Sequence, residues 1–382
     1  MKIDLYHNIR WSRYKARVFS ALHKRAISES NDVRFFQIAD TDGQRTALSG
    51  VELEYHQYPH DLLFPGSYGD IPASRLIVTL FRNVMRSDAQ LVLIPGFDQP
   101  EHWAMLLAAI LSGKKRGTFC DSTLHDRPQS AVKGVLKRVF FGLCNGVFCY
   151  GQRARKYLLH YGMNPARVHQ RYQAAALPSN YSVDVVREAR LRMAPTPGEP
   201  RFLYVGRLSP EKSLDVLLVA FAQVLSDLPA ARLVLVGGGP QANALKALAA
   251  ELHLGDAVIF AGSMGQESLA EEYARATSLV LPSRSEPWGL VVNEALHYGC
   301  PLIVSDHCGC VPELVIDGKS GYVFKTDSAE DLSSKMLKLV TEFRDVAQVT
   351  DNCLQTIAPY SPDAAARQIL TGCRVMLSVE GA

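Results

Sequence analysis

Short apolar runs alternate with helix-like segments in this chain, and the alternation restarts after a break. The first half contains strand-like KIDLYH, a helix-like stretch at 12–30, and then the apolar runs VRFFQIA, VELEYHQY and LVLIPGF. The second half contains the apolar runs RFLYVG, ARLVLVGGG, AVIFAG, TSLVLPS, CPLIVSD and GYVF. Helix-like sequence separates most of these runs, and strands that alternate with helices predict a parallel sheet wrapped by helices. The restart predicts two such α/β domains in series.

The break is the polar, Pro-rich segment APTPGEP at 194–200, whose composition suits a linker. A chain of 382 residues is long enough for two domains that each bury a hydrophobic interior. We therefore expect a first domain over 1–190, a second over 200–360, and a C-terminal helix within 361–382 that packs back on the first. Ligands of such sheets bind at the carboxyl ends of the strands, so a cleft between the halves is the expected site.

Composition excludes several classes of protein. The formal net charge of +3 is too small to indicate nucleic-acid binding, and no basic run with interleaved aromatic residues stands out. No apolar leader and no stretch of about 20 apolar residues is present, which favours a cytoplasmic location. The eight cysteines show no paired CxxC spacing, so we expect reduced thiols.

Basic residues are nevertheless unevenly distributed. One group occupies the N-terminal segment: Arg10, Arg13, Lys15, Arg17, Lys24 and Arg25. A second group, Lys133, Lys137 and Arg138, shares a predicted helix with Val132, Val135, Leu136, Val139 and Phe140. The basic face of that helix could contact the anionic inner face of a membrane. The alternative is an amphipathic helix whose apolar positions face the core and whose charges are solvated.

Two glutamates lie on either side of a predicted strand-to-helix junction in LVLPSRSEPWGLVVNEALHYG. Glu286 falls in the loop after the strand, where Ser283 and Ser285 supply capping hydroxyls, and Glu294 falls about two turns into the helix. Between them the N–H groups of Gly289 and Leu290 are unpaired at the helix start, which favours an anion such as a diphosphate. Ionised carboxylates on either side would hold sugar hydroxyls. The alternative is that both glutamates are solvated charges near a helix end.

A loop with two cations follows the strand RFLYV. Arg207 and Lys212 precede an amphipathic helix, and together they suit a diphosphate leaving group whose negative charge grows as a glycosidic bond breaks. The alternative is a surface loop in which these cations pair with Glu211.

Five motifs occur in order in the second half. They are GRLxxxK from Gly206, the VGxGP strand end at 236–240, F-x-G at 260–262, S-x-x-E-x-W-G-x-x-x-x-E-A at 283–295, and the PELVIDGKSGYV run at 312–323. In this order they resemble the retaining GT-B glycosyltransferases of family 4, over about residues 200 to 330. The resemblance implies an α/β fold of two Rossmann-like domains that face each other across a cleft.

The resemblance also implies roles for individual residues. Arg207 and Lys212 would neutralise the donor diphosphate, Glu286 would contact the transferred sugar, and Glu294 would hold the ribose. A further set would line the nucleotide through backbone groups or at the base: Gly206, Gly262, Ser263, Met264, Gly289 and Leu290. Family members usually have two glycines before the Pro-Glu pair, whereas this chain has Gly309 and Cys310, so a side chain must fit where none is expected.

The first half matches the family only in outline. Many members have a Gly-Gly loop after the first strand, whereas this chain has HNIRWSRYK, in which Arg10, Trp11 and Arg13 would contact either the donor phosphates or, as we favour, the acceptor. Members often place a histidine near the reacting carbon of the sugar, and here Asp121 and His125 in RGTFCDSTLHDRP are the candidates. His125 with Asp126 is equally typical of a helix cap. The strand end Gly96, Phe97 and Asp98 is a second candidate lining of an acceptor pocket.

We expect no metal and no cofactor. The Asp40-Thr41-Asp42 triplet has the D-x-D spacing of metal-binding transferases but is followed by Gly43 and Gln44, which suggests a hairpin turn.

The expected activity is metal-independent transfer of a hexose, with retention, from a UDP- or GDP-sugar to a hydroxyl acceptor. A lipid-linked or oligosaccharide intermediate of surface polysaccharide synthesis is the expected acceptor. The alternatives are a GT-B-like nucleotide-sugar epimerase or phosphorylase, and a binding module without catalysis. A NAD-dependent oxidoreductase is disfavoured because no G-x-G-x-x-G opens a helix after a first strand.

Overall fold

The computed structural model describes residues 1–43, 51–126, 131–170, 172–178, 180–196 and 198–378. The chain divides into two compact units. Unit 1 comprises Met1–Leu124, Pro128–Ala176 and Tyr360–Ala382, and unit 2 comprises His125–Arg127 and Leu177–Pro359. The division falls at Leu177 rather than between 190 and 200, because helix α6 (Val183–Met193) packs on helices of unit 2. Gln44, residue 197 of the predicted linker and the end of the expected C-terminal segment lie outside the described residues.

Unit 1 is built on a parallel sheet of seven strands in the order β3-β2-β1-β4-β5-β6-β7. The strands are β1 (Lys2–Ile9), β2 (Asp32–Ala39), β3 (His60–Leu62), β4 (Leu91–Ile94), β5 (Lys115–Cys120), β6 (Gly146–Cys149) and β7 (Val168–Gln170). The helices are α1 (Arg13–Ser28), α2 (Ala73–Arg86), α3 (Pro100–Leu111), α4 (Ala131–Leu143), α5 (Gln152–His160) and α14 (Pro362–Ser378). Short 3-10 turns lie at Leu53–Tyr55, Tyr68–Asp70 and Pro165–Arg167.

Unit 2 repeats the plan with a parallel sheet of six strands in the order β10-β9-β8-β11-β12-β13. The strands are β8 (Arg201–Val205), β9 (Arg232–Val236), β10 (Val258–Gly262), β11 (Ser278–Leu281), β12 (Leu302–Ser305) and β13 (Gly321–Phe324). Besides α6, the helices are α7 (Leu214–Asp227), α8 (Ala242–Glu251), α9 (Gln266–Arg275), α10 (Leu290–His297), α11 (Val311–Leu314), α12 (Ala329–Glu342) and α13 (Val346–Ile357). Short 3-10 turns lie at Pro210–Lys212, Gly255–Ala257 and Ala358–Tyr360.

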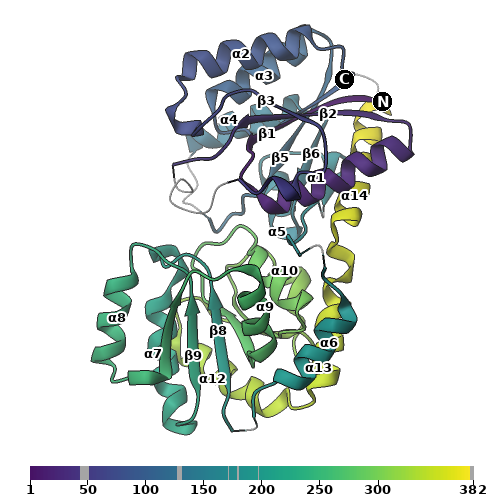
Figure 1. The fold of residues 1–382 in the computed structure, drawn as a ribbon. Coiled ribbons are helices and arrows are strands. Elements are labelled where there is room, and N and C mark those ends of the chain that lie inside the picture. The colour runs from purple at the N-terminus through teal and green to yellow at the C-terminus, as the bar shows by residue number, and fades with distance from the viewer. Residues whose placement is uncertain (44–50, 127–130, 171, 179, 197, 379–382) are drawn as a thin grey trace. The chain divides into compact units, whose positions relative to one another are not determined.

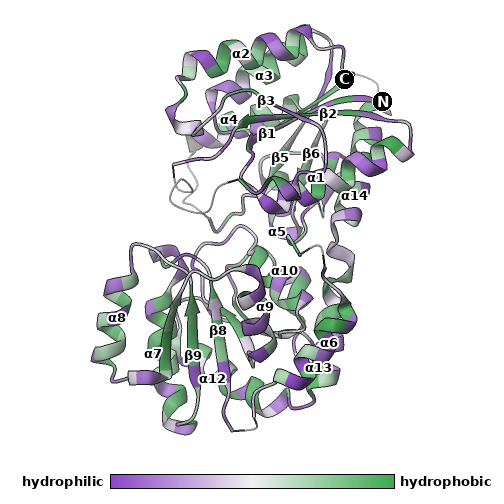
Figure 2. Cartoon of the chain, in the orientation of Figure 1, coloured by the Kyte–Doolittle hydropathy of each residue, from purple (hydrophilic) through white to green (hydrophobic). Residues whose placement is uncertain are grey.

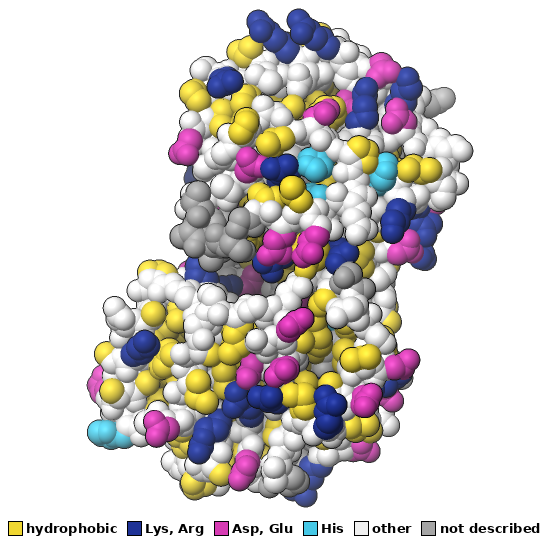
Figure 3. All heavy atoms as spheres, viewed as in Figure 1, with side chains coloured by type: hydrophobic (Ala, Val, Ile, Leu, Met, Phe, Trp, Pro, Cys, Tyr) yellow, Lys and Arg dark blue, Asp and Glu magenta, His cyan; other side chains and the backbone are white. Residues whose placement is uncertain are grey.

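Helices cover both sheets, so the central strands are largely apolar along their length rather than alternating. Strands β4, β6, β11 and β12 are buried at every position, and β8 and β9 are mostly hydrophobic along their length (Figure 2). Basic and acidic side chains are interspersed over the visible surface, in keeping with the small net charge (Figure 3). The predicted parallel α/β sheets in both halves are thus confirmed.

Two predicted elements of unit 1 differ in the structure. The run VELEYHQY forms no strand: Ser20 of α1 donates to the Tyr55 carbonyl and accepts from the Gln57 N–H, so the backbone bonds of this segment go to a helix. The D-x-D triplet begins no hairpin, because β2 and β3 pair in parallel. Asp40 instead forms an ion pair with Arg10 at 2.5 Å and accepts from the Gly66 N–H.

The C-terminal helix α14 belongs to unit 1, where it packs beside α1 and against β5, β6 and β7 (Figure 1). Two strand glycines make room for it. A Cβ atom would lie 2.7 Å from the Met376 sulfur at Gly117 and 2.5 Å from the Met376 Cε at Gly146. No helix among the described residues is long and apolar enough to cross a membrane.

Candidate functional site

The predicted site residues of unit 2 follow two neighbouring strands. Arg207 and Lys212 come after β8, whereas Glu286 and Glu294 come after β11, which pairs with β8 in parallel. From β8 the chain continues to β9 on one side, and β11 lies on the other, so the loops after β8 and β11 diverge. Such a switch point at the carboxyl ends of parallel strands is where open α/β sheets bind their ligands.

Lys212 and Glu286 are in direct contact, because the Lys212 ammonium donates to the Glu286 carboxylate. Both side chains are mostly buried. Lys212 ends a 3-10 turn, and Ser213 then takes a left-handed conformation with φ of 52° before α7 begins. The structure therefore brings together the cation and the carboxylate that the sequence places 74 residues apart.

Arg207 is arranged differently. Its guanidinium donates to Glu211 at 2.9 Å, and Ser209 donates to the same carboxylate oxygen at 2.7 Å. The Arg207 side chain is half exposed. The predicted alternative of an ion pair with Glu211 therefore describes Arg207 but not Lys212.

Helix α10 begins where the sequence indicates, directly after Gly289. Gly289 has a φ of 92°, which L side chains rarely adopt, and Leu290 is the first helical residue. The prediction that Ser283 and Ser285 cap this helix was wrong, because the cap position is Gly289 and Ser285 donates to the Asp126 carbonyl at 3.2 Å. Glu294 lies in the second turn and accepts a hydrogen bond of 3.2 Å from the Tyr273 hydroxyl.

The loop after β12 fits tightly beneath the Glu286 loop. The Gly309 N–H donates to the Glu286 carbonyl at 2.9 Å, and a Cβ atom at Gly309 would lie 1.7 Å from the Pro287 carbonyl oxygen. Cys310 has ordinary helical dihedrals, and its side chain is buried. Burial raises the pKa of its thiol well above the usual value, so it stays protonated. The cysteine at the second glycine position is thus accommodated beneath the loop.

The remaining predicted nucleotide contacts lie along the ends of β8, β9 and β10. The Gly206 N–H donates to the Val236 carbonyl at 3.0 Å, and the Gly237 N–H donates to the Gly262 carbonyl at 2.7 Å. Ser263 and Met264 follow β10, the edge strand, and Gly262 and Ser263 are exposed. These backbone bonds hold the three strand ends in one row.

Asp121 and His125 belong to different units. Asp121 follows β5 and lines a pocket of unit 1. His125 groups with unit 2, where its ring lies 4.8 Å from the His307 ring, and His307 lies 3.1 Å from the Arg284 carbonyl. Among the residues that the structure describes, no three His, Cys, Asp or Glu side chains gather closely enough to hold a metal ion.

The pocket of unit 1 has a volume of about 270 Å³. It opens at the ends of β1, β4, β5 and β6, and β1 and β4 flank the switch point of this sheet. The predicted residues Gly96, Phe97 and Asp98 line it. Arg10 and Arg13 are each paired with a carboxylate, Asp40 and Glu52 respectively, and neither lines the pocket.

The cation that lines this pocket is Lys15, which belongs to none of the motifs named above. Its ammonium lies 4.1 Å from the ring centroid of Tyr172 and between 5.3 and 5.4 Å from those of Tyr14, Phe119 and Tyr150. Only 7% of Lys15 is exposed, and burial lowers the pKa of its ammonium to about 7, against the attraction of Asp121. The four rings come from four separate segments of the chain, so no local sequence motif predicts this cluster.

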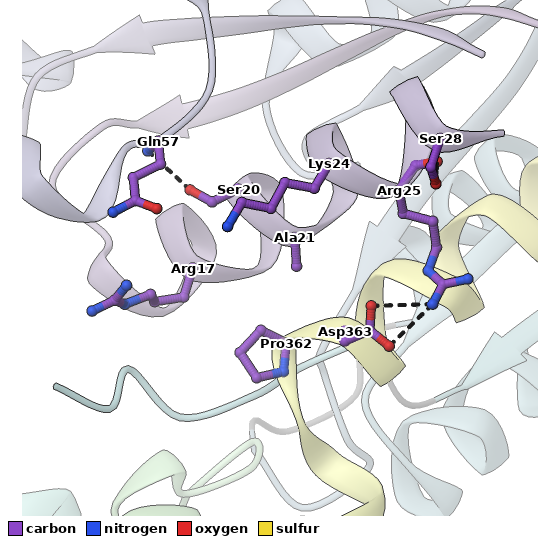
Figure 4. A pocket seen from close by; sticks show the side chains of 9 residues that line it. All are labelled: Arg17, Ser20, Ala21, Lys24, Arg25, Ser28, Gln57, Pro362 and Asp363. Atoms are coloured by element: carbon purple, nitrogen blue, oxygen red, sulfur yellow. Dashed lines mark hydrogen bonds and ion pairs between the residues drawn. The ribbon is translucent and has the colours of Figure 1, made fainter. Parts of the chain in front are cut away.

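A larger hollow of about 560 Å³ lies elsewhere in unit 1, between α1 and the start of α14 (Figure 4). The Arg25 guanidinium donates to the Asp363 carboxylate at 3.1 Å in its lining, and Arg17 and Lys24 of α1 also line it. This hollow lies away from the strand ends and holds no predicted site residue, so we assign it no role in catalysis.

Comparison with known proteins supports the motif reading of unit 2. Residues 187–352 match the family model of glycosyl transferases group 1. The sulfoquinovosyl transferase SQD2 of Arabidopsis thaliana is 34% identical over 157 residues, which are 40% of this chain and 29% of that protein. A D-inositol 3-phosphate glycosyltransferase of Streptomyces bingchenggensis is 30% identical over 224 residues, which are 56% of this chain and 49% of that protein. The chain thus spans less than half of either relative. The resemblance to glycosyltransferases is confirmed.

Solved structures resemble the whole chain. Anabaena HepE in complex with UDP and glucose has a TM-score of 0.70 at 18% identity and covers 98% of this chain and 99% of its own. The lipopolysaccharide outer core galactosyltransferase WaaB has a TM-score of 0.72 at 14% identity, with coverage of 98% and 99%. At these identities the likeness establishes the fold, and the predicted GT-B fold class is confirmed.

Proposed function

We propose that this protein transfers a hexose from a nucleoside diphosphate sugar to a hydroxyl group of an acceptor, with retention at the anomeric carbon. The observation that carries the proposal is the contact of Lys212 with Glu286 at the neighbouring ends of β8 and β11. In this proposal the Lys212 ammonium would bind the leaving phosphate, and the Glu286 carboxylate beside it would bind sugar hydroxyls. Glu286 lies in the loop that leads into α10.

The proposed donor lies along this edge of unit 2. The first N–H groups of α10, at Gly289 and Leu290, and the Lys212 ammonium would hold the diphosphate. Arg207 would exchange its exposed partner Glu211 for a phosphate oxygen. Glu286 would accept from the hydroxyls of the transferred sugar. Glu294, oriented by Tyr273, would accept from the ribose hydroxyls.

The transfer step needs no protein nucleophile in this proposal. The acceptor oxygen forms a bond to the anomeric carbon while the bond from that carbon to the phosphate oxygen breaks. The electron pair leaves on the diphosphate, and the acceptor proton passes to a departing phosphate oxygen. Lys212 and Arg207 lower the barrier because they neutralise the charge that grows on the diphosphate. We propose that neither a metal nor a cofactor takes part.

UDP is the proposed nucleotide, in preference to GDP. Anabaena HepE, which shares the fold over nearly the whole chain, was solved with UDP and glucose. The cytoplasmic location and a role in surface polysaccharide synthesis belong to the same proposal. WaaB, a lipopolysaccharide galactosyltransferase of this fold, supports the latter.

The proposed acceptor site is the pocket around Lys15. Aromatic faces beside a carboxylate and an ammonium suit a hydroxyl-rich ring, which presents C–H groups to the rings and hydroxyls to the charges. At about 270 Å³ the pocket is slightly smaller than the about 300–1,000 Å³ of drug-sized ligand sites, so it suits one sugar ring. In this proposal Asp121 and Lys15 orient the acceptor hydroxyl, and His125 contacts the transferred sugar.

A donor screen tests the proposal. Thermal shift of the full chain with UDP-, GDP- and ADP-sugars should show stabilisation by UDP-sugars, which Lys212→Ala removes. The responding donor is then incubated with and without monosaccharide and lipid-linked acceptors. Transfer to an added acceptor supports the proposal. Conversion of the donor sugar into its epimer without any acceptor would instead establish the epimerase alternative.

A further inference from the structure

Helix α4 exposes the aliphatic residues that its sequence predicts to be core. Phe140 and Phe141 are buried, but five side chains at helical spacing are exposed: Val132, Val135, Leu136, Val139 and Leu143. Positions separated by three, four and seven residues share one face of a helix, so these side chains form a continuous stripe. Helix α4 is amphipathic as the sequence indicates, but its apolar stripe faces solvent instead of the core.

Helix α3 carries a second stripe. Leu107, Ile110 and Leu111 are exposed, and Trp103, one turn before Leu107, is half-buried. The Trp103 ring meets the Phe140 ring edge-on at 5.0 Å, which connects the two helices. We call the exposed side chains of α3 and α4 together the aliphatic surface. A surface patch of this kind on a single protein usually marks a binding site.

The charges on α4 and α5 beside the aliphatic surface are all of one sign. The sequence contains no Asp or Glu between Asp126 and Asp184, a span that includes α4 and α5. Lys133 and Arg138 of α4 and Lys156 of α5 are exposed. Lys137 extends from α4 over the rings of Tyr157 and Tyr161, which places α5 beside α4. The aliphatic surface therefore has a basic border on the side of α4 and α5.

From this arrangement we infer that the aliphatic surface docks on an anionic phospholipid bilayer. Aliphatic side chains enter the boundary between headgroups and acyl chains, and basic residues beside them pair with lipid phosphates. Nucleic acid would satisfy the basic border but leave the valines and leucines exposed to water. A second copy of the chain, joined about a twofold axis, would bring the two basic borders together, where they repel.

This inference does not rest on the transfer reaction. Docking depends on α3, α4 and α5 of unit 1, whereas donor binding is proposed for unit 2. If both hold, the acceptors are those that a bilayer presents at its surface.

Vesicle co-sedimentation of the full chain tests the inference. One set of vesicles contains phosphatidylcholine alone, and the other contains phosphatidylcholine with phosphatidylglycerol. The test variant is Val135→Glu with Leu136→Glu, at side chains that are 60% and 53% exposed. The matched control is Val185→Glu with Leu191→Glu on α6, at 62% and 57%. Because all four positions are exposed, both variants should fold, which circular dichroism checks.

We expect the wild type and the α6 variant to bind anionic vesicles equally and neutral vesicles at least tenfold more weakly. The α4 glutamate variant should lose more than tenfold of its partition onto anionic vesicles. Lys133→Gln should lower the partition onto anionic vesicles about fivefold, because one basic residue near an anionic surface contributes about 1 kcal/mol. Arg138→Gln should lower it by the same factor.

Equal vesicle binding by the α4 variant and the wild type would overturn the inference. The inference would also be overturned if the wild type did not bind vesicles but doubled in mass as its concentration rose, and the α4 variant did not. That result would establish self-association through the aliphatic surface. Thermal shift by the UDP-sugar is measured on the same samples. Loss of vesicle binding with that shift unchanged separates this inference from the proposed donor site.

Discussion

The two units place their candidate sites at the same topological position but fill them with different chemistry. In unit 2, the strand ends of β8 and β11 bear an ion pair, Lys212 with Glu286, and a helix start. In unit 1, the strand ends around β1 and β4 bear a lysine enclosed by four aromatic rings. The first arrangement suits a charged ligand, and the second suits a largely uncharged ring.

A local motif is informative for one of these two sites only. Each contact proposed for the donor diphosphate comes from a loop of a few residues, so it appears in the sequence as a short string. The rings around Lys15 come from positions 14, 119, 150 and 172, which only the folded sheet assembles. The two sites therefore predict different responses to substitution.

The largest effect should come from Lys212→Ala. Removal of one preorganised charge from a transition state typically costs about 10²–10³-fold in turnover. Steady-state kinetics with saturating donor should show a loss of that size. Lys335→Ala is the control, because Lys335 pairs with Asp331 at 3.9 Å on α12, away from the strand ends. Near-normal turnover of Lys212→Ala would show that Lys212 does not bind the donor diphosphate. The proposed difference between a charged site in unit 2 and an aromatic site in unit 1 would then fail.

Next in size is Gly309→Ala, which should destabilise unit 2 by about 3 kcal/mol or more. The added Cβ would meet the Pro287 carbonyl oxygen at 1.7 Å, so the loop must move or the backbone must strain. Urea unfolding measures the loss. Gly238→Ala, where a Cβ meets nothing within 4 Å, should be nearly neutral. Equal stability of the two variants would show that the loop after β12 is not tightly fitted.

A third substitution, Lys15→Met, should separate the two sites. We expect the acceptor KM to rise about tenfold or more, because Lys15 lines only the unit 1 pocket, while the thermal shift with the donor is unchanged. Lys24→Met on the same helix is the matched control. A parallel loss of donor binding would contradict the assignment of donor and acceptor to separate units.

The same lysine should make stability depend on pH. Burial lowers its pKa from 10.5 to about 7, so between these values the unfolded chain holds a proton that the folded chain lacks. Stability contributed by this group therefore rises with pH across that window, by about 1.4 kcal/mol per pH unit at most. Urea unfolding near pH 7 and pH 8 should show the wild type gaining about 1 kcal/mol over Lys15→Met. Parallel profiles of the two proteins would contradict a buried, neutralised Lys15.

The smallest effect should come from Tyr273→Phe. It removes one hydrogen bond of 3.2 Å to Glu294, worth about 1 kcal/mol, so the donor Kd should rise about fivefold. Calorimetric titration with the donor measures it. Tyr322→Phe also removes a hydroxyl bonded to a glutamate, Glu342, but away from the strand ends, and should leave donor binding unchanged.

Sequence reasoning predicted the repeated sheet, and it placed Lys212 and Glu286 each in a loop after a strand, because strand periodicity and strand-end loops are local properties. The contact between the two side chains is a finding of the structure. Sequence reasoning was wrong about VELEYHQY, where the backbone exchanges hydrogen bonds with the Ser20 hydroxyl of α1 instead of with a neighbouring strand. It also missed the environment of Lys15, which appeared only as one member of a basic segment. Both failures concern contacts between residues distant in sequence, which composition and periodicity do not encode.

The membership of α14 in unit 1 has a consequence for how the chain folds during synthesis. Unit 1 needs its last helix, since Met376 lies against the glycines of β5 and β6, whereas unit 2 is encoded before that helix. Domains usually complete folding in the order in which the ribosome releases them. Here the order is reversed, because unit 2 can complete its fold before α14 has emerged, while the β5–β7 face of unit 1 is still uncovered. A nascent chain halted before α14 should therefore contain a folded second unit and an incomplete first one.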